Sequence, residues 1–227
     1  MRIELDARLN MLAALTPACP VAADVGADHG FLGAWLLQNK RCMRVQFLDI
    51  SAPSLEKARR LIDDEGLNDR AVFSVGDGLE ALLEPAEAIV IAGMGGPTIA
   101  GIIERGQKRL QGARLIMQPN VGIRELREQL MKMGFRIVDE RLARAAGRWY
   151  VGIAAEEGEA EYSPEELLAG PVLLKEKPEG LAAYAEDRIH VLQKAFEGAV
   201  RGSKHEMTEQ LAWELAQWKE IRACLQP

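Results

Sequence analysis

The chain has 227 residues, of which 48% are hydrophobic, and its formal net charge is −6 at pH 7. This composition is ample for a packed core, and the length fits one large domain or one domain with a smaller partner. The first eight positions contain charged residues, and no apolar run approaches the roughly 20 residues of a membrane span. We therefore expect that the chain has no signal peptide and no membrane anchor. The acidic total disfavours a protein that coats nucleic acid, although a local basic face can coexist with it.

The three cysteines, Cys19, Cys42 and Cys224, are an odd number without the spacing of a metal site. Such usage is typical of free thiols in a reducing compartment. We therefore expect a cytoplasmic protein that holds no metal.

Short β-type runs alternate with helix-type periodicity along the first two thirds of the chain, which predicts a parallel sheet with helices on both faces. The predicted strands cover residues 21–25, 44–50, 71–75, 87–93, 113–118, 135–140 and 148–155, and the helices between them 29–39, 51–65, 97–110 and 120–133. The last two strands are joined by too few residues for a parallel crossover. We therefore expect seven strands, with the last one antiparallel.

An acidic stretch from residue 154 to 166, with Gly158, Ser163 and Pro164, predicts a linker. Beyond it the apolar residues follow helix spacing only. We expect one domain over residues 1–160 and a second, helical domain over residues 161–227.

The second domain carries two apolar stripes at helix spacing. The stripes comprise Leu181, Ala185, Ile189, Leu192, Phe196 and Val200, and then Met207, Leu211, Leu215, Trp218, Ile221 and Leu225. Between them Gly202 breaks the pattern, and Ser203 with Glu206 predicts a capping box. This pattern predicts two long helices folded back as an antiparallel hairpin.

The stretch "AADVGADHGFLG", residues 22 to 33, is typical of the tight turn in a nucleotide-binding strand–helix unit. In the dinucleotide fingerprint, the second glycine lets the backbone approach a pyrophosphate. Asp28 occupies that position here, and its carboxylate would repel a phosphate at the helix N-terminus. S-adenosylmethionine fits better, because its methionyl part carries an ammonium and a sulfonium and no phosphate, so that carboxylates can bind it.

Two further acids follow the next predicted strands. Asp49 lies at about the spacing from Asp24 at which an acid reaches a ribose diol, and Asp77 lies where an acid could accept from an adenine amino group. Each could instead be a helix cap or a turn residue. Three acids at successive strand ends converge on one crevice, which favours S-adenosylmethionine. His29 lines the same site or only occupies the first helical turn.

The segment Gly93-Met94-Gly95-Gly96-Pro97 follows the fourth predicted strand, where methyltransferases of this architecture hold the acceptor. It offers backbone and space and no side-chain acceptor, or else it is only a tight glycine turn. Asn120, after the fifth strand, caps the next helix or touches the acceptor, and capping is the favoured interpretation.

Six motifs in order, "RLNMLAALTP", "ADVGADHGFL", "LDIS", "GDGL", "IAGMGG" and "QPN", resemble the bacterial tRNA adenine-N1 methyltransferases that modify adenine 22 in the D-arm. The resemblance runs from about residue 5 to 154, and the helical hairpin resembles that family's coiled-coil-like C-terminal domain. It implies a Rossmann-like class I methyltransferase fold with a seven-stranded sheet, S-adenosylmethionine as the cofactor, tRNA as the partner and N1 of adenine as the target. We expect a monomer without membrane contact.

The same motifs imply the site residues. The expected cofactor-binding set is Asp24, Gly26, Asp28, His29, Gly30, Asp49, Ile50, Asp77, Gly78, Gly93, Met94 and Gly95, and the expected catalytic residues are Asp28 and Asn120. Adenine N1 is already nucleophilic, so the enzyme mainly has to align it with the methyl group. Asp28 could stabilise the cationic product base.

Basic residues crowd the second half of the first domain, which predicts a face that contacts phosphates. They are Arg105, Lys108, Arg109, Arg114, Arg124, Arg127, Lys132, Arg136, Arg141, Arg144 and Arg148. Alternatively they only solvate exposed helix faces. Two other functions stay open at this point: a small-molecule methyltransferase, and a module that binds the cofactor without catalysis.

Overall fold

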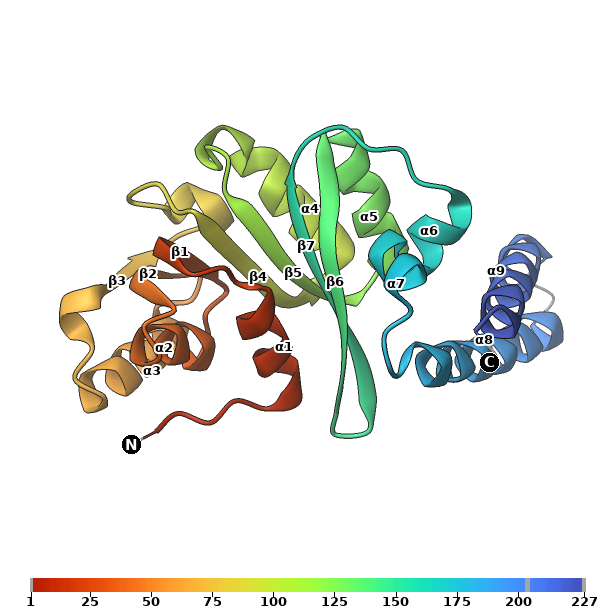
Figure 1. Ribbon diagram of the computed structural model, residues 1–227, viewed down its shortest axis with the longest axis horizontal. Helices are drawn as coiled ribbons and strands as arrows, with labels where there is room; N and C mark the ends of the chain where they lie inside the picture. Colours follow the sequence, from red (N-terminus) through yellow and green to blue (C-terminus); the bar gives the residue numbers. More distant parts are fainter. Residues whose placement is uncertain (1, 203–204, 226–227) are drawn as a thin grey trace. The chain divides into compact units, whose positions relative to one another are not determined.

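The computed structural model describes residues 2–202 and 205–225 (Figure 1). Within these ranges, seven strands form one sheet in the order β3-β2-β1-β4-β5-β7-β6. The strands are β1 (Cys19–Val25), β2 (Cys42–Asp49), β3 (Ala71–Val75), β4 (Ala88–Gly95), β5 (Arg114–Val121), β6 (Phe135–Ala145) and β7 (Arg148–Glu157). Strand β7 runs antiparallel to both its neighbours, and the other pairs are parallel. The predicted α/β fold with a reversed last strand is confirmed.

The chain divides into two compact units, Met1–Glu161 and Tyr162–Pro227. In the first unit the central strands are buried on both faces, as strands of a parallel sheet are when helices cover them. Fully buried residues on β1, β4 and β5 include Ala22, Ala23, Ile89, Val90, Ile91, Leu115 and Ile116. This burial explains why these strands are continuous apolar runs in the sequence.

The helices of the first unit connect these strands. They are α1 (Ala7–Leu15), α2 (Phe31–Gln38), α3 (Ala52–Asp64), α4 (Gly96–Gly106) and α5 (Ile123–Lys132), with short 3₁₀ turns η1 (Asn68–Arg70), η2 (Gly78–Ala81) and η3 (Gln107–Arg109). The sequence pattern did not predict α1, which packs against β6 and β7. Asp6 caps this helix by accepting a hydrogen bond from the Leu9 N–H at 2.7 Å. The contact with β7 is close, because a Cβ at Gly152 would meet Leu15 Cδ1 at 2.7 Å.

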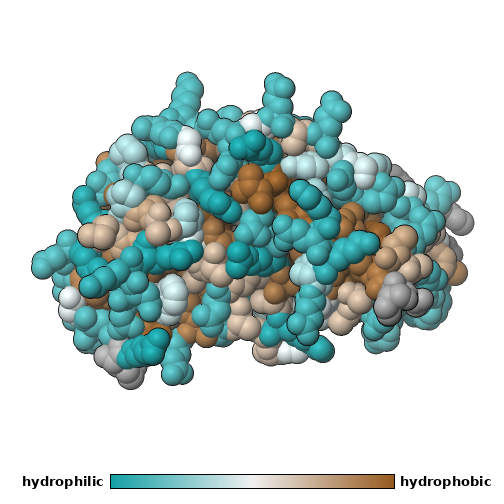
Figure 2. Space-filling view, in the orientation of Figure 1, coloured by the Kyte–Doolittle hydropathy of each residue, from teal (hydrophilic) through white to brown (hydrophobic). Residues whose placement is uncertain are grey.

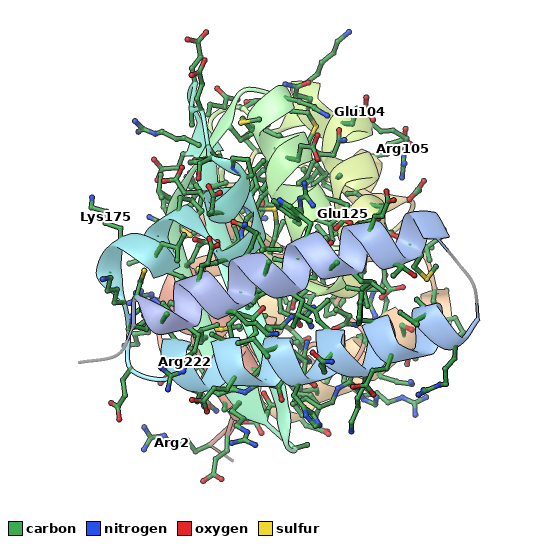
Figure 3. All side chains as sticks on the ribbon, turned by 90° about the vertical axis from the view of Figure 1, so that its right-hand side faces the viewer. Arg2, Glu104, Arg105, Glu125, Lys175 and Arg222 are labelled. Atoms are coloured by element: carbon green, nitrogen blue, oxygen red, sulfur yellow. The ribbon has the colours of Figure 1, made fainter. Side chains whose placement is uncertain are left out.

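The second unit contains α6 (Pro164–Ala169), α7 (Pro171–Glu176), α8 (Leu181–Arg201) and α9 (His205–Ala223). Helices α8 and α9 form the predicted hairpin and lie side by side (Figure 3). Tyr184 and Trp218 join them edge to face, with ring centroids 5.4 Å apart. The predicted linker extends too far toward the C-terminus. Its last residues belong to α6, which begins with a capping box formed by Ser163 and Glu166.

The predicted apolar stripes are wrong at the far end of the hairpin. Val200 is 53% exposed and Met207 is 49% exposed, whereas Ala199 is buried. Ala199 lies about five turns of 3.6 residues after Leu181 and so shares its face, while Val200 is rotated about 100° further around the helix. The capping box expected from Ser203 and Glu206 lies outside the residues whose side chains the structure describes.

Over the described ranges, no helix combines the length and the apolar character that crossing a membrane requires. The face drawn in Figure 2 is mainly hydrophilic, with small separate apolar patches.

Candidate active site

A cavity of about 440 Å³ lies at the carboxyl ends of β1 and β4. From β1 the sheet continues through β2 and β3 on one side and through β4 and β5 on the other. The cavity therefore lies at the topological switch point, where ligands bind in open α/β sheets. Its walls come from the start of α1, the loop between β1 and α2, and the end of β4. They are formed by Asp6, Arg8, Leu9, Asp24, Gly26, Ala27, Asp28, His29, Gly30, Phe31, Leu32, Ala92 and Gly93.

The loop between β1 and α2 is tightly wound. Gly26 and Gly30 have φ values of 74° and 72°, and a Cβ at Gly30 would meet the Ala58 Cβ at 2.7 Å. Asp28 adopts a φ of 44°, a region that side chains other than glycine enter at a cost of about 1–3 kcal/mol. The positive φ values favour glycine at positions 26 and 30, and Asp28, between them, lines the cavity.

Asp24 is the buried carboxylate of the cavity, with 7% of its surface exposed. Its Oδ2 accepts a hydrogen bond from the Gly33 N–H at 3.3 Å. Burial raises the pKa of Asp24 to about 6, an effect that the charge of Asp49 reinforces and that the Gly33 N–H and Arg8 oppose. A buried carboxylate of this kind is stabilised when a cation binds beside it.

Asp49 connects the end of β2 to the glycine loop. Its Oδ2 accepts from the Asp28 N–H at 3.2 Å, and its Oδ1 accepts from the Ser51 N–H at 2.8 Å. Ser51, rather than Asp49, caps α3, so the alternative role of Asp49 as that cap is wrong. The Asp28 carboxylate is 62% exposed and lies 3.7 Å from Lys57 Nζ and 3.8 Å from His29 Nε2.

Four of the expected cofactor residues, at or just after the ends of β2 and β3, do not line the cavity: Asp49, Ile50, Asp77 and Gly78. Ile50 is 73% exposed. Asp77 accepts hydrogen bonds from Arg105 Nη2 at 3.1 and 3.3 Å. Gly78 has a φ of 56° and begins the turn η2.

The end of β4 carries the last group of expected residues. Gly93 lines the cavity, Met94 lies at a register shift against β5, and Gly95 precedes α4 as its N-cap. A Cβ at Gly26 would meet the Met94 Cε at 2.4 Å, so the two glycine-rich segments approach each other closely. A bulge that redirects the chain is common beside active sites.

Asn120 lies on β5, and Gly122 is the N-cap of α5, so the favoured capping role of Asn120 is wrong. Its Nδ2 donates to the Gly93 carbonyl at 2.6 Å, and its Oδ1 accepts from Gln118 Nε2 at 3.1 Å. Gln118 is fully buried, and its Oε1 accepts from Arg8 Nη1 at 3.0 Å. A continuous chain of hydrogen bonds thus runs from Arg8 to the β4 loop.

Among the residues that chemical reasoning on the sequence missed are Arg8, which lines the cavity, and Gln118, which accepts a hydrogen bond from Arg8. Both lie inside quoted motifs, "RLNMLAALTP" and "QPN", which is the signal that could have found them. Arg8 also lies over the Tyr150 ring, 5.9 Å from its centroid. Within the described residues, no three His, Cys, Asp or Glu side chains gather closely enough to hold a metal ion.

The predicted basic face needs correction at Arg127. This side chain is 1% exposed and forms an ion pair with the equally buried Glu140, Nη2 to Oε1, at 2.8 Å. It is a core residue and is not accessible to phosphates. Arg114 and Arg136 both lie 3.6 Å from the carboxylate of Glu156, which offsets part of their charge.

Exposed basic side chains also lie near the tip of the β6–β7 hairpin, which projects beyond the neighbouring strands (Figure 1). We call residues 141–149 the hairpin tip. It carries Arg141, which pairs with Asp139 at 3.1 Å, and Arg144, whose guanidinium lies 5.7 Å from the centroid of the Trp149 ring. Arg148 is exposed at the start of β7.

Comparison with known proteins agrees with this geometry. A family model described as a methyltransferase domain matches residues 5–153. The tRNA (adenine(22)-N(1))-methyltransferase of Bacillus subtilis (strain 168) is 32% identical over 96% of this chain and 95% of its own length. The crystal structure of the B. subtilis M1A22 tRNA methyltransferase TrmK matches with a TM-score of 0.86 and 30% identity, covering 97% of this chain and 99% of that one.

A second solved structure is that of Streptococcus pneumoniae Sp1610, described as a putative tRNA (m1A22) methyltransferase in complex with S-adenosyl-L-methionine. It matches with a TM-score of 0.87 and 27% identity, covering 96% of this chain and all of that one (100%). The chain belongs to the tRNA (adenine(22)-N(1))-methyltransferase family, with a methyltransferase domain over residues 5–153.

Proposed function

We propose that this chain transfers a methyl group from S-adenosylmethionine to N1 of adenine 22 in the D-arm of tRNA. The observation that carries the proposal is the cavity at the switch point of the sheet, where a buried carboxylate, an arginine and a glycine loop meet. The relatives named above, which span nearly the whole chain, support it. On this proposal the protein acts in the cytoplasm as a monomer.

The cavity fits the methionyl end of S-adenosylmethionine by charge. The Asp24 carboxylate suits an ammonium, because a bound cation offsets the burial that raises the pKa of this group. Arg8 lines the same cavity and suits the carboxylate of the ligand. Opposite charges on two walls of the cavity select a zwitterionic amino acid group over a phosphate.

We assign the nucleoside end of the ligand to the edge that β2 and β3 form. Asp49 accepts two backbone hydrogen bonds, and a carboxylate has about four acceptor positions, so it can also accept from a ribose diol. Ile50 offers an exposed apolar surface for the adenine ring. Asp77 would share its carboxylate between Arg105 and the adenine amino group.

Bound S-adenosylmethionine supplies a methyl group activated by the sulfonium, and adenine N1 supplies the lone pair. The chain has to align the two and exclude water. Asp28 lines the cavity and stabilises the positive charge that passes to the base. Asn120 acts as a positioning residue, because its amide holds the Gly93 carbonyl on the acceptor side and is itself oriented by Gln118.

We assign tRNA contact to the hairpin tip and to the helical domain. The exposed arginines at the tip suit phosphates, and Trp149 beside Arg144 suits an unstacked base. Adenine 22 has to leave its stack before N1 is reachable, which costs a few kcal/mol. We place the domain boundary at residue 160, with catalysis in residues 1–160 and support of the tRNA body in residues 161–227.

The test is methyl transfer from labelled S-adenosylmethionine to unmodified tRNA, followed by nucleoside analysis. We expect 1-methyladenosine from wild type and at most a trace from Asp24→Ala. A parallel reaction with a low-molecular-weight cell extract tests the small-molecule alternative. Label in the extract and none in tRNA would overturn the proposal, and cofactor binding without transfer to either would indicate a non-catalytic module.

A further inference from the structure

Two of the three cysteines meet at the amino ends of neighbouring strands. Cys19 is the first residue of β1 and Cys42 the first of β2, and the two are direct partners in the parallel ladder. Their sulfur atoms lie 3.3 Å apart in hydrogen-bond contact, and both thiols are free. The sequence positions alone gave no sign of this pairing.

The geometry of this pair suits a disulfide. Neighbouring strands place paired Cα atoms about 4.8 Å apart, inside the range of about 4.4–6.8 Å that disulfides span. The sulfur atoms need to approach by little more than 1 Å to reach a bond length of about 2.05 Å. Rotation of the two side chains supplies such a movement without displacing either strand.

The two thiols differ in access. Cys42 is fully buried, whereas Cys19 is half-buried and therefore reachable from solvent. Cys224, in the second unit, is exposed. Within the pair, an oxidant would therefore react with Cys19 first, and the neighbouring Cys42 could then form the disulfide with it.

We propose that Cys19 and Cys42 form an oxidation site, closing to an intramolecular disulfide when the chain meets an oxidised low-molecular-weight disulfide such as glutathione disulfide. The hydrogen bond with Cys42 raises the pKa of the Cys19 thiol, so this thiol first has to lose its proton to solvent. The resulting thiolate attacks one sulfur of the reagent, giving a mixed disulfide and releasing one thiol. Cys42 then loses its proton, attacks the Cys19 sulfur and releases the second thiol. The protein loses two protons and two electrons, and the reagent is reduced to two thiols.

The bond has a specific structural consequence. It closes the segment from β1 to β2, which includes the Gly26–Gly30 loop and α2 and so one wall of the cavity. The sulfur atoms lie at the amino ends of β1 and β2, whereas this wall lies at the carboxyl ends of the strands. The disulfide therefore restricts the unfolded chain and raises the melting temperature by about 5–10 °C, while the affinity for S-adenosylmethionine changes less than twofold.

The experiment uses the full chain with Cys224→Ser, which leaves only the pair. After incubation with glutathione disulfide, we expect both thiols to be lost in a denaturing thiol titration, and mass spectrometry to show a Cys19–Cys42 cross-linked peptide without retained glutathione. Adding Cys42→Ala removes the resolving thiol, so glutathione should remain attached to Cys19. Adding Cys19→Ala instead should leave the buried Cys42 thiol free.

Three results would overturn the proposal. They are two free thiols after exposure to the oxidant, glutathione retained on Cys19 when Cys42 is present, and cross-linked dimers on a non-reducing gel. Thermal melts of the oxidised and reduced protein then test the consequence, and an unchanged melting temperature would contradict the expected restriction of the chain.

Discussion

Asp24→Asn should make the folded chain more stable at neutral pH and at the same time weaken cofactor binding. Burial raises the pKa of Asp24 from 3.8 to about 6 in the folded protein. At about 1.36 kcal/mol per pH unit, this shift of roughly 2 units corresponds to about 3 kcal/mol lost from folding stability when the group is ionised. Asparagine removes the charge and can still accept the hydrogen bond from the Gly33 N–H.

The pH dependence fixes the sign of this effect. Because the folded-state pKa lies above the unfolded value, the favourable contribution of protonated Asp24 is complete below about pH 3.8 and is lost as the pH rises through about 6. The stability difference between Asp24→Asn and wild type should therefore be small near pH 4. It should grow to at most about 3 kcal/mol above pH 7.

Urea unfolding at a series of pH values measures this difference, with Asp64→Asn on the exposed end of α3 as the matched control. Calorimetry then measures S-adenosylmethionine binding, where loss of a charge-assisted hydrogen bond of about 1.5–3 kcal/mol should lower the affinity about 10- to 100-fold. A variant no more stable than wild type at pH 7.5 would refute the burial argument. Unchanged affinity would refute the ammonium assignment.

Four further changes test other parts of the molecule. Asp49→Ala should lower S-adenosylmethionine affinity about tenfold in calorimetry, since it removes the proposed ribose acceptor and the hydrogen bond to the Asp28 N–H of the loop. Arg141→Glu with Arg144→Glu should weaken tRNA binding in filter assays, more at low than at high salt, and leave cofactor affinity unchanged. Arg127→Ala should cost about 3–5 kcal/mol in urea unfolding, because buried Glu140 loses its partner. Treatment with a chelator should leave tRNA methylation at its original rate, and a loss would reveal a metal requirement.

The sheet was predictable from the sequence because its central strands are buried on both faces and read as apolar runs. Helix α1 was not, since its role is to fill the space against β6 and β7 rather than to present one apolar stripe. Arg8 was missed with it, because its place in the cavity depends on that packing.

The acids of the glycine loop were identifiable, because a carboxylate stands where a phosphate-binding loop has glycine. Side-chain contacts between elements that are distant in the sequence could not be predicted. Arg127 meets Glu140 across α5 and β6, and Asn120 holds the Gly93 carbonyl across β5 and β4. Spacing along the chain contains no information about such contacts, so Arg127 was wrongly assigned to the basic face and Asn120 was wrongly favoured as a helix cap.

The central claim is the position of the methyl group, and reverse transcription across the product tRNA tests it most directly, because a methyl group on adenine N1 blocks base pairing. Two tRNA transcripts that differ only in adenine or guanine at position 22 are each incubated with the chain and S-adenosylmethionine. We predict a stop at position 22 in the adenine transcript and none in the guanine transcript. An equal stop elsewhere in both transcripts, or no stop in either, would contradict the account.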